Sequence, residues 1–287
     1  MRLVMVHGRS QQGKDELKLK KEWLDALAYG LARADKTLPA GTTIEFPYYG
    51  DFLAQLVEQT NTPLGAAINA KGPNPDGVSD ADFRGEVLDE IARSFGLTDA
   101  DIRRELSGPT VKGPANWEWV QAIMRAMDRI PGVNTGAIDL FTRDVFVYLT
   151  FPGVARKIDK LVDDAIGDSP CVVLAHSLGT VVAYNVLRHR DATLKCARLV
   201  TVGSPLGIRA IKRYLETPIG SPACVDSWFN AYDDRDFVAL MALDNRNFDV
   251  IPPIENKSDV RNFTDNRHGI DGYLADPVVA AKVVEFL

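Results

Sequence analysis

The chain has 287 residues, of which 46% are hydrophobic and 25% are charged, and its formal net charge is −6. This is the usage of an ordinary globular protein, and it excludes a disordered, collagen-like or low-complexity chain. The negative charge argues against a broad surface for nucleic acid, so no nucleic-acid partner is expected.

The sequence shows little sign of a signal peptide, a membrane-spanning segment or a set of disulfide bonds. The longest N-terminal apolar run, Leu3–Val6, is too short for a signal-peptide core, and no stretch approaches the ~20 apolar residues of a membrane span. Cys171, Cys196 and Cys224 are odd in number and lack CxxC spacing, which favours buried thiols in a reducing compartment. We therefore expect a cytoplasmic protein without a transmembrane segment, and we make no prediction about its oligomeric state.

Short apolar runs alternate with longer amphipathic stretches, which is typical of βα units on a parallel sheet. The expected strands are residues 2–6, 43–48, 171–175, 197–202 and 225–232. The expected helices are residues 15–34, 154–166, 178–188 and 277–287. The runs CVVLA and RLVTVG are nearly continuous apolar segments, as in strands that are buried on both faces. The pattern predicts an α/β fold with a mostly parallel central sheet flanked by helices.

The alternation breaks between residues 51 and 153, where no convincing strand is found. Apolar stripes at helical spacing begin at Phe83, Trp117 and Ile138, and Thr98 with Asp101 forms a capping box before residues 102–106. Residues 61–80, rich in proline and glycine, are expected to form a loop. We predict one α/β domain made of residues 1–50 and 154–287, interrupted by a helical insertion, residues 51–153, that serves as a cap.

The cap is expected to shape a pocket over the site, although its side chains suit two interpretations. They fit an apolar acyl group and ordinary core packing equally well. The aromatic and methionine side chains concerned are Phe83, Phe95, Trp117, Trp119, Met124, Met127, Phe141 and Phe146.

A serine stands at a predicted strand-to-helix junction, in the run Ala175-His176-Ser177-Leu178-Gly179. This is close to G-x-S-x-G, in which a sharp bend exposes a nucleophilic serine. Ala175 replaces the first glycine but keeps a small residue there, and Gly179 keeps the second. The alternative is that Ser177 only caps the following helix.

A serine nucleophile needs a base, and the base needs a group that orients it. Of the four histidines, only His268 lies in a late loop before the terminal helix, so it is the expected base. The expected acid follows the strand at residues 225–232, with Asp236 preferred, Asp234 second and Asp233 third.

Backbone N–H groups are expected to stabilise the oxyanion of the reaction. One belongs to Leu178, directly after the serine, and the other to Arg9, or to Ser10, in the loop after the first strand. Gly8 permits a tight turn in that loop.

With these pieces the sequence resembles the α/β-hydrolase superfamily, in its serine esterase and lipase branch. The matching segments are VHGRS, AHSLG, GSPLG, NAYDDRDFV and RHGIDGY, within residues 1–50 and 154–287. The resemblance implies the α/β-hydrolase fold and hydrolysis of carboxylic esters without a cofactor or a metal. Ser177 would be the nucleophile, His268 the base and Asp236 the acid, with a small-molecule substrate that is a lipid-like or other acyl ester.

Two alternatives come from other functional classes. The run from Gly8 to Lys14 spells G-x-x-x-x-G-K, the phosphate-binding loop of nucleotide hydrolases, but Asp15 stands where a metal-binding hydroxyl is required. Asp15 is then better explained as an acidic residue at a helix N-terminus. The other alternative is a non-catalytic binding module on a hydrolase-like fold.

Overall fold

The computed structural model describes residues 1–9, 11–60, 80–106, 108–113, 116–131 and 133–287. In these residues a single six-stranded sheet is found, and all its neighbouring strands are parallel. The strands are β1 (Arg2–Val6), β2 (Thr43–Glu45), β3 (Cys171–His176), β4 (Cys196–Val202), β5 (Trp228–Ala231) and β6 (Glu255–Lys257). Their order is β2-β1-β3-β4-β5-β6. The chain thus moves outward from β1 to β2 and then returns to the other side of β1. Such a reversal opens a crevice at the carboxyl ends of the two central strands, here β1 and β3.

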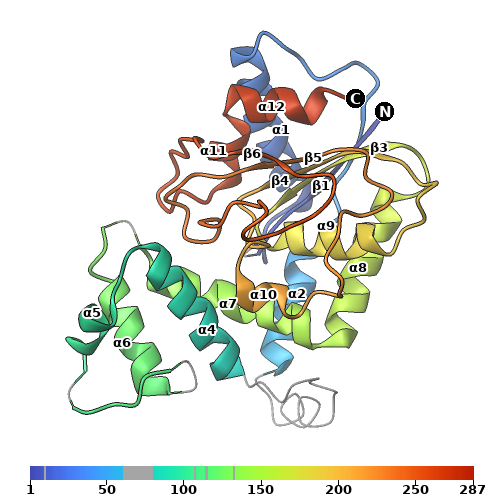
Figure 1. The fold of residues 1–287 in the computed structure, drawn as a ribbon. Coiled ribbons are helices and arrows are strands. Elements are labelled where there is room, and N and C mark those ends of the chain that lie inside the picture. Colours follow the sequence, from blue (N-terminus) through green and yellow to red (C-terminus); the bar gives the residue numbers. More distant parts are fainter. Residues whose placement is uncertain (10, 61–79, 107, 114–115, 132) are drawn as a thin grey trace.

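Helices cover both faces of this sheet (Figure 1). Helices α1, α11 and α12 lie on one face, whereas α2, α8 and α9 lie on the other. Apart from α4 to α7, which are described below, the helices are α1 (Glu16–Arg33), α2 (Gly50–Thr60), α8 (Pro152–Ile166), α9 (Leu178–Arg188), α10 (Arg209–Lys212), α11 (Ile270–Leu274) and α12 (Pro277–Val284). Helix α2 thus falls at the start of the predicted insertion, although it covers a face of the sheet. The side chains of β1 alternate between the two layers, since Leu3 and Met5 join one apolar cluster while Val4 and Val6 join the other. The α/β layering predicted from the alternating pattern is confirmed.

The elements predicted for the sheet and its helices are present, with small differences in length. The helix predicted over residues 178–188 has the same bounds as α9. β2 stops before Pro47, which has no N–H for a sheet hydrogen bond. β5 begins only at Trp228, because Val225 makes a single isolated bridge to Cys196. β6 was missed in the sequence because it is a short polar strand, Glu-Asn-Lys, at the edge of the sheet.

The insertion contributes helices where helical stripes were predicted. These are α4 (Asp80–Ser94), α5 (Asp99–Arg103), α6 (Trp117–Met127) and α7 (Thr135–Thr150). The capping box is present, with Thr98 and Asp101 bonded reciprocally at the start of α5. The predicted loop at residues 61–80 lies outside the described residues, except for Asp80, which begins α4.

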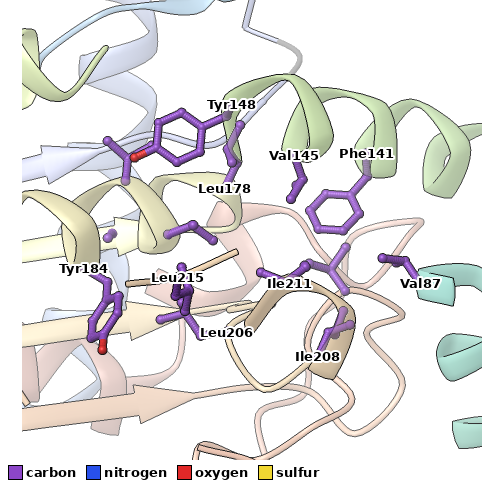
Figure 2. Close-up of a cluster of buried hydrophobic side chains, with 14 of the residues drawn as sticks. Val87, Phe141, Val145, Tyr148, Leu178, Tyr184, Leu206, Ile208, Ile211 and Leu215 are labelled. Carbon is purple, nitrogen blue, oxygen red and sulfur yellow. The ribbon is translucent and has the colours of Figure 1, made fainter. Parts of the chain in front are cut away.

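One continuous apolar cluster joins the insertion to the sheet domain. Figure 2 shows Phe141 and Val145 of α7 beside Ile211 of α10, with Leu178 of α9 to one side and Val87 of α4 at the outer end. Most of the aromatic and methionine side chains of the insertion are buried in or packed against this cluster, so core packing accounts for them. They are Phe83, Phe95, Trp119, Met124, Met127, Phe141 and Phe146. Trp117 is 42% exposed, and the Arg84 guanidinium lies over its ring.

The three cysteines are free and buried, as predicted. Among the described helices none is long and apolar enough to cross a membrane.

Candidate active site

Ser177 is the single residue between the end of β3 and the start of α9. Its φ of 56° and ψ of −129° form a conformation that costs a residue with a side chain on the order of 1–3 kcal/mol. Its side chain makes no hydrogen bond to cap α9, so the capping interpretation does not describe this serine. The strained bend instead directs the hydroxyl away from the helix and toward a histidine.

Two glycines allow the chain to pack tightly around this bend. A Cβ on Gly8 would lie 2.7 Å from the Ser177 Cβ, and a Cβ on Gly179 would lie 2.4 Å from the Val6 carbonyl oxygen. Real Cβ atoms do not approach backbone so closely. Lack of space therefore requires the small residue predicted at Gly179, and it also requires glycine at position 8, which was predicted only to permit a tight turn.

Ser177, His268 and Asp236 form a continuous chain of hydrogen bonds. The Ser177 hydroxyl is 2.8 Å from Nε2 of His268, and Nδ1 of His268 is 2.7 Å from Oδ2 of Asp236. Because a carboxylate only accepts, Nδ1 carries the proton and Nε2 is free to accept the proton of the serine. Ser177 and Asp236 are almost completely buried, and the His268 side chain is 12% exposed.

The Asp236 carboxylate is held by three donors. Its Oδ1 accepts the Val238 N–H at 2.9 Å, and its Oδ2 accepts the Tyr273 hydroxyl at 2.5 Å in addition to His268. Tyr273 was not singled out from the sequence, although it ends the RHGIDGY segment that contains His268. Gly203, with a φ of 59°, makes room for both rings, because a Cβ there would lie 3.1 Å from each.

The two other candidate acids do not reach His268. Asp234 is a surface residue, with a side chain that is 61% exposed and pairs with Arg235 and Arg261. Asp233 is fully buried, but its carboxylate accepts the N–H groups of Arg235 and Asn262, at 2.9 and 2.8 Å, and so ties two loops together.

The other three histidines make contacts outside the Ser177–His268–Asp236 hydrogen-bond chain. His7 is buried, accepts the Tyr49 N–H at 3.0 Å, and has a pKa lowered to about 4, chiefly by its burial. His176 donates from Nε2 to the His268 carbonyl oxygen at 2.7 Å, and burial holds its pKa well below the ordinary value. Both are therefore neutral near pH 7. His176 supports the loop that carries His268, and His189 pairs with Glu216 on the surface.

The two backbone N–H groups predicted to stabilise an oxyanion belong to segments next to Ser177. Leu178 is the first residue of α9, and the first N–H groups of a helix lack intrahelical acceptors. Arg9 follows Gly8, which abuts Ser177. Neither the Leu178 N–H nor the Arg9 N–H has an acceptor among the described residues. Ser10, the alternative donor, lies outside them.

A cleft of about 290 Å³ opens above the serine. Ser177, His176 and Trp23 line it, together with charged side chains that include Arg9, Lys14 and Glu22. Apolar wall residues come from α7 and from the loop after β5. These wall residues are Ala137, Phe141, Phe237 and Val238. Phe141 is the one aromatic or methionine residue of the insertion among the described residues that line this cleft.

The G-x-x-x-x-G-K segment lies beside the same cleft, and Lys14 lines it. The Gly13 N–H, which would face a phosphate, donates to the Asp51 carboxylate at 2.5 Å. Asp15 caps α1 by accepting the Lys18 N–H at 2.8 Å, as its sequence position predicted. No cluster of three metal-binding side chains is found in the part of the chain that the structure describes.

Neither a protein-family model nor a curated protein sequence matches this chain. The functional argument therefore depends on the geometry of the site.

Proposed function

We propose that this protein is a serine hydrolase of the α/β-hydrolase fold that cleaves a carboxylic ester through an acyl-enzyme. The observation that carries the proposal is the hydrogen-bonded chain from Ser177 through His268 to Asp236 at the carboxyl edge of a parallel sheet. The order Ser, Asp, His along the chain and the strained strand-to-helix bend at Ser177 also support it.

In the proposed reaction, the Ser177 hydroxyl attacks the ester carbonyl carbon while Nε2 of His268 takes its proton. The N–H groups of Leu178 and Arg9 stabilise the oxyanion, and His268 then protonates the departing alcohol. Water, deprotonated by the same histidine, attacks the acyl-enzyme. The bond from the acyl carbon to the Ser177 Oγ then breaks, His268 returns its proton to that oxygen, and the carboxylic acid leaves. Asp236 holds His268 in the required tautomer and stabilises the imidazolium that forms. No cofactor or metal is required.

The electrostatic surroundings suit this role for His268. His7 and His176 are neutral near pH 7, so neither opposes the positive charge that appears on His268 during attack. Apolar side chains of α7 and of the loop after β5 line the cleft beside the serine, and apolar surroundings strengthen hydrogen bonds to a developing charge.

A fluorophosphonate probe with mass spectrometry of the labelled peptide tests the proposal. We expect modification at Ser177, loss of labelling in Ser177→Ala, and a drop in kcat of about 10⁴-fold or more on a p-nitrophenyl ester. Ser169→Ala, at an exposed serine before β3, is the matched control and should keep full labelling.

Two outcomes would contradict the proposal. Ser177→Ala that hydrolyses the ester at the parent rate excludes this serine as the nucleophile. Absence of labelling together with thermal stabilisation by ATP would favour the nucleotide-binding alternative, and absence of both would favour a non-catalytic binding module.

A further inference from the structure

The Arg9 side chain crosses from the loop after β1 to helix α7. Its Nε donates to Oδ2 of Asp144 at 2.7 Å, and one terminal nitrogen donates to the Ala137 carbonyl oxygen at 3.2 Å. The side chains of Arg9 and Asp144 are each only 15% exposed. Burial raises the pKa of Asp144, and the guanidinium of Arg9 opposes that shift. A long side chain held at both branches in this way is a fixed part of the wall rather than a mobile surface group.

A second cavity, also of about 290 Å³, lies on the other side of this side chain. Arg9 lines both the catalytic cleft and this second cavity, and Asp144 lines the second. Helices α2 and α7, which lie side by side below the sheet, form its walls (Figure 1). Its lining is mixed: Leu53, Ala54, Val57 and Leu140 are apolar, whereas Arg9, Gln12, Glu58, Arg143 and Asp144 are polar or charged.

The chemistry of the site determines which part of an ester faces Arg9. His268 must protonate the departing oxygen, so the alcohol portion has to lie on the His268 side of the serine. The residues on that side of the cleft belong to the loop and helix that follow His268, among them Gly269, Ile270 and Asp271. The acyl portion then extends away from His268, along Ala137 and Phe141 and toward the Arg9 side chain.

From this arrangement we propose that Arg9, held in place by Asp144, is the end wall of the acyl subsite and limits the length of acyl chain that the enzyme accepts. The inference rests on the proposed function, because it assigns the acyl side of that same site. Behind the wall, the apolar side chains of the second cavity offer a surface for the end of a longer chain once the wall is removed.

The test measures kcat/KM on p-nitrophenyl esters of two to twelve acyl carbons for the parent and for Arg9→Ala/Asp144→Ala. The double variant is used because Arg9→Ala alone would leave the Asp144 carboxylate buried without its partner. We expect the preferred chain to lengthen by at least two carbons, with about a four-fold gain for each further buried methylene. The readout is the ratio between long and short esters, since loosening the Arg9 loop would slow all substrates alike.

Two further variants serve as matched controls. Ala54→Phe added to the double variant fills the second cavity, so it should restore the parental chain-length profile. Arg143→Ala changes a residue that lines the second cavity but not the catalytic cleft, so the profile should stay parental.

A double variant that is folded and labelled at Ser177, yet keeps the parental profile, would overturn the end-wall proposal and leave the proposed function intact. A profile that lengthens but is not shortened by Ala54→Phe would also overturn it, because the second cavity would then not be the space that was gained. A parent protein that is not labelled at Ser177 would overturn both proposals together.

Discussion

Three aspartates within four residues offer a sharp test of the site, because each carboxylate has a different environment. Exchange for asparagine keeps the size of each side chain and removes only its charge and part of its accepting capacity. Asp236→Asn places an amide against Nδ1 of His268, so the histidine loses its carboxylate and is pushed toward the wrong tautomer. We expect kcat to fall by about 10⁴-fold, the loss found where a carboxylate orients the histidine of a serine hydrolase.

The other two exchanges should separate catalysis from folding. Asp233→Asn weakens two buried hydrogen bonds, to the N–H groups of Arg235 and Asn262, and should cost about 1–3 kcal/mol of stability. For a chain of this size this lowers Tm by roughly 2 °C per kcal/mol. Asp234→Asn alters an exposed side chain, so kcat should stay at the parental value. The free energy of unfolding should change by no more than about 0.5 kcal/mol.

The measurements are steady-state hydrolysis of one p-nitrophenyl ester and thermal melting of all three variants beside the parent protein. The expected pattern is a large rate loss for Asp236→Asn, a lowered Tm for Asp233→Asn and parental values for Asp234→Asn. Equal and small rate losses in all three variants would refute the assignment of Asp236. A large rate loss in Asp234→Asn with Asp236→Asn unaffected would move the acid to the surface position.

Substitution of Tyr273 should lower kcat, and substitution of His7 should change how stability depends on pH. Tyr273→Phe removes one of the hydrogen-bond donors to Asp236. In steady-state kinetics we expect kcat to fall about ten-fold, with KM nearly unchanged. A parental kcat would show that the tyrosine is dispensable for orienting the acid. His7, with a folded pKa of about 4 against 6.5 in the unfolded chain, contributes no destabilisation above pH 6.5, but as pH falls from 6.5 to 4 the unfolded state takes up a proton that the folded state refuses. In urea unfolding, His7 should therefore contribute a loss of about 3 kcal/mol over that interval, in addition to the loss from His176, whose pKa burial also lowers. His7→Gln should reduce the total loss by about this amount; an unchanged slope would place the loss on other groups.

Among the described residues of the predicted insertion, those that line the proposed catalytic cleft belong to helix α7. Of the described insertion residues, Ala137 and Phe141 of α7 line the catalytic cleft, while Asp144 of the same helix holds Arg9. Helices α4, α5 and α6 lie farther out (Figure 1). Changes in α7 are thus expected to alter specificity, whereas changes in the outer helices act on packing.

Local patterns in the sequence were enough to predict the main elements and to single out Ser177 and His268, which the structure places in hydrogen-bond contact. The apolar run before Ser177 and the amphipathic stretch after it predict the bend, because strand and helix periodicities are properties of neighbouring residues. The same periodicities place His268 in a loop, because it lies after the last predicted strand and before the predicted terminal helix. The sequence left the acid open among Asp233, Asp234 and Asp236, since all three follow the same strand.

Contacts between distant segments of the chain decided which aspartate faces His268 and which side chains surround the cleft. Asp236 is distinguished from Asp233 only because β5, the loop before α11 and Tyr273 meet there, so that one carboxylate faces His268 and the other is bound by Asn262. The Arg9–Asp144 pair joins positions 135 residues apart, and the cavities on either side of it exist only once α2 and α7 are packed. Periodicity along the chain determines where strands, helices and turns form. Which side chains face one another at the carboxyl edge of the sheet depends on how the layers pack, and no local pattern encodes it.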